Sequence, residues 1–254
     1  MRDFTLNSYV KILDTLVGAG FSVHGVANWV EGKHESGACI RHDVDRKPKN
    51  ALAMAKKEFE LGIASTYYFR IVRSSFCART VEQIAELGHE IGYHYEDVSL
   101  AGGNVSNAVE LFKANLSRLR SIAPIKTVVM HGRPLSKHNN MAIWDHISLQ
   151  DVDLIADALM SINYERLPYF TDTGRQWGAL ATNLRDRPET GAFDMSSSIS
   201  TTDDLCQFIQ AGSCRAISLA VHPERWSNDR IDWTGQLIKD TGANLIKRGL
   251  HFIR

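Results

Sequence analysis

Strand-like segments alternate with helix-like segments along most of this 254-residue chain, and this alternation constrains the fold more than any other feature. Segments rich in β-branched and aromatic residues predict strands over residues 38–45, 66–72, 90–97, 126–134 and 217–225. Strands that alternate with crossover helices pair in parallel, so the pattern predicts an α/β fold, either a barrel or an open doubly wound sheet. No Gly-x-Gly-x-x-Gly motif or phosphate-binding loop follows a predicted strand, which argues against a nucleotide-binding sheet.

Helical periodicity occupies the intervals between the strands. Helices are expected at the N-terminus up to Gly18, from Pro48 to about Leu61, over 81–88, over 105–123, over 151–159 and within 231–248. In the second of these helices, Leu52, Ala55 and Phe59 are expected to share one face. Short strands and loops are expected around YFTDTGRQW, within residues 164–200.

Composition limits the class of protein. Apolar residues make up 44% and charged residues 23%, as in globular proteins with a substantial core. The 29 basic and 29 acidic residues cancel, which argues against nucleic-acid or membrane-surface binding. No stretch approaches the roughly 20 apolar residues that span a bilayer, and the N-terminal pattern is amphipathic rather than a signal sequence. We therefore expect one cytoplasmic domain over 1–254, in which 1–38 form a helical and strand extension.

Chemically capable side chains follow four of the predicted strands. Asp43 and Asp45 end the first strand, and His94, His131 and His222 follow three later ones. The carboxyl ends of parallel strands form the site face of α/β folds, so these side chains are expected to converge on one rim. A lone histidine after an apolar strand is more often structural. Here, however, three histidines and an Asp-x-Asp pair occupy equivalent strand ends, and chance would have to act four times to produce this.

Side chains alternate along a strand, and this separates the candidates. Arg41, Asp43 and Asp45 are expected on one face of the first strand, with His42 on the other. The same alternation places His89 and His94 on opposite faces, and we expect His89 to be structural.

Two carboxylates and neutral imidazoles are suitable ligands for zinc or another divalent metal ion. One carboxylate would bind the ion and its neighbour would act as a general base on water. The alternative is a salt-bridge network in which Asp43 and Asp45 pair with Arg41 or Arg133.

The motifs RHDVD, GHEIGYHYEDVS, HGRPLSKHNN, YFTDTGRQW and AVHPERW, which fall within residues 39–228, resemble those of the polysaccharide deacetylase superfamily (NodB homology, carbohydrate esterase family 4). The resemblance implies a distorted (β/α)7 barrel as a single domain. It also implies a metal-dependent hydrolase that removes an N-acetyl group from an amino sugar.

The resemblance also implies roles for individual residues. By motif, Asp43 is similar to the catalytic base and Asp45 to the metal-binding aspartate. His94 matches a metal-binding histidine, and His222 matches the late histidine that acts as general acid. Arg133 resembles the arginine that tunes the base.

The chain departs from the family pattern at Val98, where a second metal-binding histidine is expected. The third ligand is then His131, Asp97 or Glu96, or the site binds metal poorly. We favour His131 because it directly follows a strand.

The expected substrate is a small carbohydrate or sugar precursor, such as a nucleotide- or lipid-linked N-acetylhexosamine. Tyr95, Arg175 and Trp177 are candidates for lining its cleft, because sugar rings stack on aromatic side chains. Two alternatives stay open: a catalytically impaired relative that binds a carbohydrate or nucleotide sugar, and a hydrolase of another non-peptide amide. The sequence carries no prediction of oligomeric state.

Overall fold

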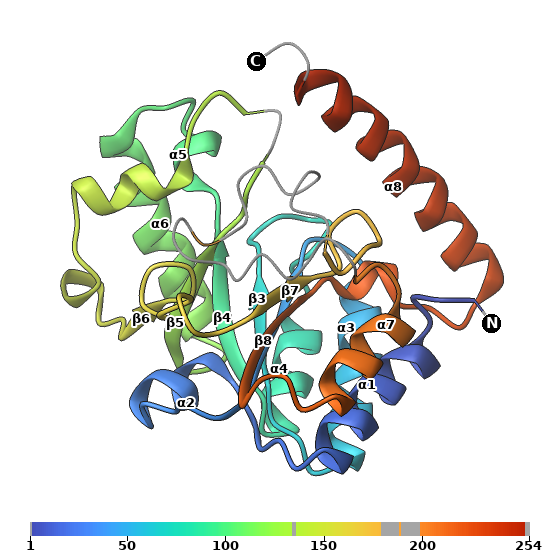
Figure 1. Ribbon diagram of the computed structural model, residues 1–254. Coiled ribbons are helices and arrows are strands. Elements are labelled where there is room, and N and C mark those ends of the chain that lie inside the picture. Colours follow the sequence, from blue (N-terminus) through green and yellow to red (C-terminus); the bar gives the residue numbers. More distant parts are fainter. Residues whose placement is uncertain (1, 134–135, 179–187, 189–198, 252–254) are drawn as a thin grey trace.

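The computed structural model describes residues 2–133, 136–178, 188 and 199–251, and the strands within these ranges form one curled parallel sheet (Figure 1). The strands are β1 (Val23–His24), β2 (Gly37–Val44), β3 (Thr66–Phe69), β4 (Glu90–Tyr95), β5 (Ile125–Met130), β6 (Ala156–Asp157), β7 (Tyr169–Thr171) and β8 (Ala216–Val221). Their order is β6-β5-β4-β3-β2-β8-β7, and β1 pairs with β2. No pairing joins β6 to β7 in the described part, so the sheet is a curled half-barrel, and a closed (β/α)7 barrel stays a prediction.

Helices cover the outer side of the sheet. They are α1 (Leu6–Gly18), α2 (Val26–Glu31), α3 (Pro48–Glu60), α4 (Ala78–Glu86), α5 (Asp97–Leu100), α6 (Val105–Arg120), α7 (Thr202–Gln210) and α8 (Arg230–His251). Three short 3-10 helices, η1 (Asn140–Asp145), η2 (Gln150–Val152) and η4 (Pro223–Arg225), complete the described helical segments. Figure 1 shows α1, α3 and α7 grouped together, α5 and α6 beside β4 and β5, and α8 projecting from the body.

Most predicted elements are confirmed, with changes at their ends. The helix over 151–159 is wrong: this segment contains η2 and the edge strand β6. Asp153 adopts a left-handed conformation (φ 52°), which breaks a helix, and Ile155 N and Ala158 N donate to carbonyl oxygens of the neighbouring β5 segment. Helix α7 is not among the predicted elements. Of the segment 164–200, β7 is described, whereas 179–187 and 189–198 lie outside the described residues.

The predicted face of α3 is also wrong in part. Phe59 is 57% exposed, whereas Glu58 is fully buried beside Ala55. The buried face is therefore rotated by one residue and carries a carboxylate, which the apolar pattern could not indicate.

The N-terminal 38 residues are packed against the rest of the fold. Helix α1 buries Tyr9, Ile12 and Leu16 and contacts α3 and α7, while β1 extends the sheet beside β2. A capping box at Thr5 starts α1: the Thr5 side chain accepts from Ser8 N, and the Ser8 hydroxyl accepts from Thr5 N.

The strand register brings the carboxyl ends of the strands to a common edge. Val44 in β2 pairs with Phe69 in β3, and His94 in β4 pairs with Val129 in β5. On the other side of β2, His42 pairs with Val221, the last residue of β8. Residues that follow these strands therefore share one edge of the sheet.

Candidate metal centre

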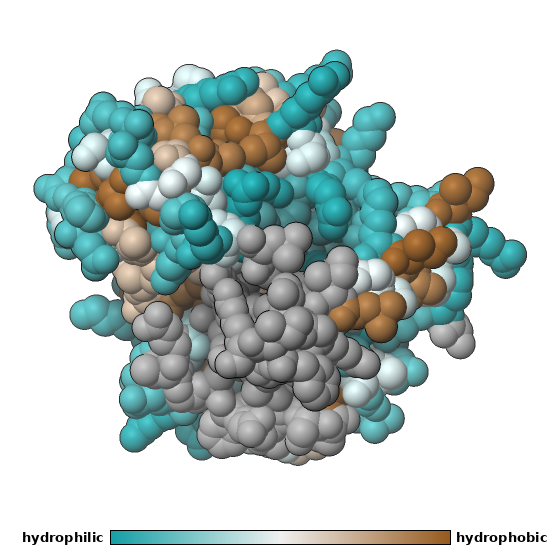
Figure 2. Space-filling view, turned by 90° about the horizontal axis from the view of Figure 1, so that it is seen from above, coloured by the Kyte–Doolittle hydropathy of each residue, from teal (hydrophilic) through white to brown (hydrophobic). Residues whose placement is uncertain are grey.

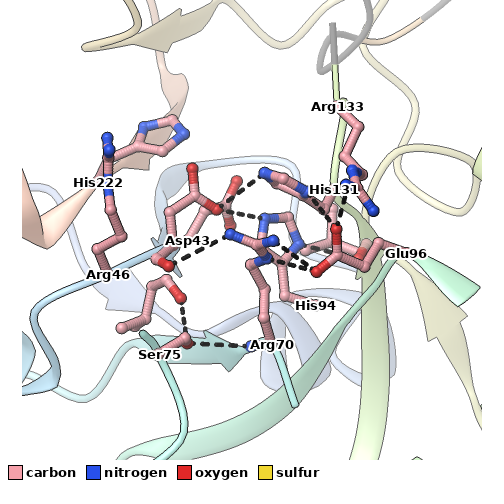
Figure 3. A network of polar contacts seen from close by, with 12 residues as sticks. Asp43, Arg46, Arg70, Ser75, His94, Glu96, His131, Arg133 and His222 are labelled. Atoms are coloured by element: carbon pink, nitrogen blue, oxygen red, sulfur yellow. Dashed lines mark hydrogen bonds and ion pairs between the residues drawn. The ribbon is translucent and has the colours of Figure 1, made fainter. Parts of the chain in front are cut away.

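Three of the predicted site residues meet at this edge, although they come from separate strands. Asp45 follows β2, His94 lies near the end of β4, and His131 follows β5. Asp45 Oδ1 lies 3.4 Å from His94 Nε2 and 3.3 Å from His131 Nε2. Ligand atoms of all three side chains lie within 4.8 Å of one another, as a shared metal ion requires. Figure 3 shows the rings of His94 and His131 side by side. We call these three residues the trio.

Two of the facing atoms have no hydrogen-bond partner. Asp45 Oδ1 and His94 Nε2 are buried, and neither makes a hydrogen bond to any described residue. Buried polar atoms are nearly always paired, so orphaned atoms that face each other need an explanation such as an ion. No other group of three histidine, cysteine or acidic side chains in the described ranges brings ligand atoms together in this way.

The outer nitrogen of each imidazole is held by an acceptor. His94 Nδ1 lies 3.1 Å from the carbonyl oxygen of Val129 on the paired strand, and His131 Nδ1 lies 3.2 Å from Glu96 Oε2. When each ring carries a single proton, on the Nδ1 that donates to these acceptors, the Nε2 lone pair of each ring is directed at Asp45. Metal-binding histidines are oriented in this way in proteins.

Glu96 links the trio to two cations. It accepts from Arg70 Nε at 2.8 Å and from Arg70 Nη2 at 2.5 Å, and Arg133 Nε lies 3.5 Å from its other oxygen. Burial would raise the pKa of Glu96, but His131 and Arg70 lower it to about 2. Glu96 is therefore an ionised carboxylate that fixes the His131 ring.

The charges of the trio favour a cation at its centre. Burial would raise the pKa of Asp45, yet His131 and His94 hold it well below its usual range. Burial would lower the pKa of His131, but Asp45 and Glu96 raise it to about 9. Without a metal ion, the carboxylates of Asp45 and Glu96 stabilise a proton on His131. A bound metal ion would take the place of that proton and its positive charge.

The main chain at Asp45 is tied to the end of β3. The Ser75 hydroxyl donates to the carbonyl oxygen of Val44 and accepts from Arg70 N at 3.2 Å. Arg70 Nη1 lies 3.3 Å from the carbonyl oxygen of Asp45. Arg70 thus positions Asp45 and Glu96 together.

The other two candidates for the third ligand, Glu96 and Asp97, have other partners. Glu96 binds His131 and Arg70, as described above. Asp97 accepts from the Tyr93 hydroxyl and from Asn115 Nδ2, and burial raises its pKa to about 6. Val98, where a histidine was expected, is buried in the hydrophobic core. Of the three candidate ligands, His131 is the one that the structure places beside Asp45 and His94.

Asp43 lies on the same side as the trio, as the alternation of β2 predicts (Figure 3). Its Oδ2 is 3.3 Å from Arg41 Nη2, and both side chains are buried, so the ion pair expected in the salt-bridge alternative is present for this residue. His42 points to the other face of β2, where its Nε2 is 2.8 Å from Glu58 Oε1.

His222 lies on the opposite side of Asp43 from the trio (Figure 3). Its Nδ1 is 2.6 Å from Asp172 Oδ1, and its main-chain N–H donates to Asp172 Oδ2 at 2.9 Å. Trp226 Nε1 also donates to Asp172 Oδ2, at 2.7 Å. Burial would raise the pKa of Asp172, but His222 and Arg225 lower it. Asp172 is thus an ionised partner that orients the His222 ring.

Arg133 and the predicted substrate-binding residues are spread over different regions. Arg133 has a left-handed backbone (φ 33°) and a partly exposed side chain beside Glu96, rather than beside Asp43. Tyr95 is fully buried, and its hydroxyl donates to Asp157 Oδ2 at 2.8 Å. Trp177 is buried against Trp226, and Arg175 lies over the Trp233 ring. The structure does not bring Tyr95, Trp177 or Arg175 to the trio.

Sequence reasoning missed Arg70, Asp172 and Glu224. Arg70 follows β3 and Asp172 follows β7, so the rule that selected residues at strand ends would have found both once the strand ends were known. Glu224 is fully buried, and burial and the charge of Asp45 raise its pKa. Arg46 Nη2 lies 3.5 Å from Glu224 Oε1.

His89 has the structural role expected for it. Its Nδ1 accepts from Ser65 N at 3.2 Å, and its Nε2 lies 2.9 Å from the carbonyl oxygen of Ala55.

No family model matches the chain, and no curated protein matches it. In the described ranges, every helix is too short or too polar to span a bilayer.

Proposed function

We propose that the chain is a metal-dependent hydrolase that removes an acyl group, in the leading case N-acetyl, from an amino sugar or sugar precursor. The observation that carries the proposal is the trio, whose ligand atoms lie close together and in which the buried Asp45 Oδ1 and His94 Nε2 face each other without a hydrogen bond. The closed (β/α)7 barrel and the cytoplasmic location belong to the same proposal. The motif resemblance supports the choice of substrate class.

The donor set fits a divalent metal ion. Two imidazole nitrogens and one carboxylate oxygen are common ligands of catalytic zinc, which keeps further positions for water and substrate. Zinc is therefore the ion proposed for Asp45, His94 and His131. When bound there, such an ion would polarise the acyl oxygen and acidify a water molecule.

Asp43 and His222 supply the proton transfers in this proposal. The Asp43 carboxylate would accept a proton from the attacking water, and its ion pair with Arg41 offsets the cost of burying this charge. His222 would donate a proton to the leaving amine, and Asp172 holds its Nδ1 so that Nε2 is the nitrogen available for the transfer. Asp43 lies between His222 and the two histidines of the trio (Figure 3).

Two variants separate metal binding from catalysis. Asp43→Asn should retain bound metal and lose hydrolysis by about 10²–10⁴-fold, because a general base contributes this much. His94→Ala should lose both metal and hydrolysis. His146→Ala is the matched control, since this histidine is exposed. Metal content is measured by mass spectrometry of the purified protein, and hydrolysis by release of acetate from a panel of N-acetyl sugars and small amides.

Several results would contradict the proposal. Normal turnover by Asp43→Asn would refute its role as base. A wild-type protein that takes up no divalent ion would favour a carbohydrate-binding protein without catalysis. Hydrolysis of small amides but no N-acetyl sugar would place the enzyme in a different substrate class.

A further inference from the structure

The C-terminal helix α8 is attached to the body by polar contacts along one side. Asp240 is buried, with its Oδ2 3.7 Å from Arg225 Nε and its Oδ1 accepting from Gln236 Nε2 at 3.1 Å. Asn244 Nδ2 donates to the carbonyl oxygen of Gly174, and Lys47 pairs with Asp232 at 2.6 Å. The inner side of α8 is thus occupied by ion pairs and hydrogen bonds.

The outer side of α8 carries an apolar stripe. Ile231, Ile238 and Leu245 are 85%, 68% and 66% exposed, the highest values among the large apolar side chains in the described ranges. They are spaced by seven residues, so they lie on one face of the helix. Figure 2 shows a row of hydrophobic side chains along the projecting helix, at the right of the view. We call these three residues the α8 stripe.

Glycines repeat with the same period beside the stripe. Gly235 and Gly242 lie on α8, and a side-chain carbon added at either would meet no atom within 4 Å. Each glycine costs a helix roughly 1 kcal/mol relative to alanine, and no close contact with the described residues requires a glycine at either position. Small residues beside an apolar stripe allow the backbone of another helix to approach closely.

We infer that the α8 stripe pairs with the α8 stripe of a second copy of this chain, in antiparallel orientation. The order of residues along this face is nearly the same when α8 is read in either direction from Ile238. In an antiparallel pair centred on Ile238, Ile231 faces Leu245, and Gly235 faces Thr241, next to Gly242. A two-fold interface requires this self-complementarity, because each residue must meet its counterpart in both directions. Antiparallel helices also oppose their dipoles favourably.

The width of the stripe favours a helix partner over a lipid surface. Thr234 and Thr241 accompany Ile231 and Ile238 on this side, and both threonines are exposed. A membrane-binding helix needs a broad apolar face, whereas this stripe is a single row of apolar side chains with threonines and glycines beside it, a width that one facing helix can cover. A helix of 22 residues is about 33 Å long. Such a contact lies at the low end of interface sizes, so a reversible dimer is expected.

Sedimentation velocity of the full chain over a concentration series tests the inference. The wild type should form a dimer that dissociates on dilution, and Ile238→Glu should be monomeric throughout. Circular dichroism checks that the variant is folded, since a surface substitution should change stability little. Phe59→Glu is the matched control, because Phe59 is an exposed apolar residue on α3 and should leave the dimer intact.

Cysteine cross-linking tests the orientation. In a background with the exposed Cys77 replaced by serine, Ile238→Cys should form a disulfide-linked dimer under oxidation, since residue 238 lies on the two-fold axis. Ile231→Cys alone should not cross-link, whereas Ile231→Cys combined with Leu245→Cys should. Cross-linking by Ile231→Cys alone would refute the antiparallel arrangement.

Three outcomes would overturn the inference as a whole. The first is a wild-type chain that stays monomeric over the full concentration series. The second is a dimer that persists in Ile238→Glu. The third is a monomer that co-sediments with vesicles of phosphatidylcholine and phosphatidylglycerol and loses this binding in Ile238→Glu, which would identify a lipid surface as the partner. None of these readouts depends on the proposed hydrolase activity.

Discussion

Two polar clusters lie on opposite faces of β2, although their residues in that strand are neighbours in the sequence. On one face, His42 contacts the fully buried Glu58 of α3. On the other face, Asp43 and then Asp45 lead to the trio. Both clusters contain buried carboxylates beside histidines, so burial and residue type do not distinguish them.

The clusters differ in how their oxygens are used. Glu58 Oε1 accepts from the Tyr9 hydroxyl and lies near His42 Nε2, and Oε2 accepts from the Ser65 and Tyr67 hydroxyls at 2.7 Å each. Asp45 Oδ1 and His94 Nε2 make no hydrogen bond within the described ranges. A carboxylate whose oxygens are both bonded stabilises the fold, whereas facing atoms without partners indicate a place for a ligand.

The largest effect on folding is expected at Glu58. Glu58→Gln leaves His42 without its charged partner and places an amide NH₂ against hydroxyl donors. We expect the free energy of unfolding to fall by about 3–5 kcal/mol, the usual cost of breaking a buried pair. Urea denaturation measures this change. Glu60→Gln is the control on the same helix, because its pair with Lys57 is exposed and should contribute less than about 1 kcal/mol.

A small effect of Glu58→Gln, close to that of Glu60→Gln, would contradict the structural role of this cluster. If folded Glu58→Gln protein lost its bound metal, the two clusters would not be independent of each other.

The sequence could predict one cluster and not the other. Asp45, His94, His131 and His222 each lie at the end of an apolar strand, and position along a strand is readable from a pattern of period two. Glu58 lies in a helix whose apolar pattern placed Phe59 inside, and only the packing of α3 on β2 and β3 shows that the buried face is shifted. Tyr95 and Trp177 were expected in a cleft for their residue type, but residue type alone does not say which side of an element faces the core.

The carboxylate partners of His131 and His222 could not be predicted from the sequence either. Glu96 holds His131 because β4 and β5 are paired in a register that no local pattern gives. Asp172 meets His222 because β7 pairs with β8, across 50 positions of sequence.

Acid should weaken the Glu58 cluster. Burial would raise the pKa of Glu58, but His42, His89 and the Tyr9 hydroxyl lower it to about 2, from an ordinary value of 4.5. A carboxyl group whose pKa is lowered by folding stabilises the fold at every pH above its pKa in the unfolded chain. This contribution is lost as the pH falls toward the folded-state pKa of about 2. The difference of 2.5 pKa units corresponds to about 3 kcal/mol.

The stability difference between the wild type and Glu58→Gln should therefore shrink as the pH is lowered from 5 to 2. Urea denaturation of both proteins at several pH values measures it. A constant difference over this range would show that Glu58 does not titrate with a lowered pKa.

Glu96→Gln gives the smallest effect and tests the trio without touching it. The amide keeps the shape of Glu96 but removes the negative charge that orients His131 through Nδ1 and forms an ion pair with Arg70. We expect metal affinity to fall by about 10–100-fold, as for other partners of metal-binding histidines, which is about 1.4–2.8 kcal/mol. Competition with a chromogenic zinc chelator measures this affinity, and the exposed Glu86→Gln is the control. Full metal occupancy should return at high zinc, because Asp45, His94 and His131 remain. Complete loss of binding at saturating zinc would instead make Glu96 a ligand, and unchanged affinity would show that His131 needs no carboxylate to hold it.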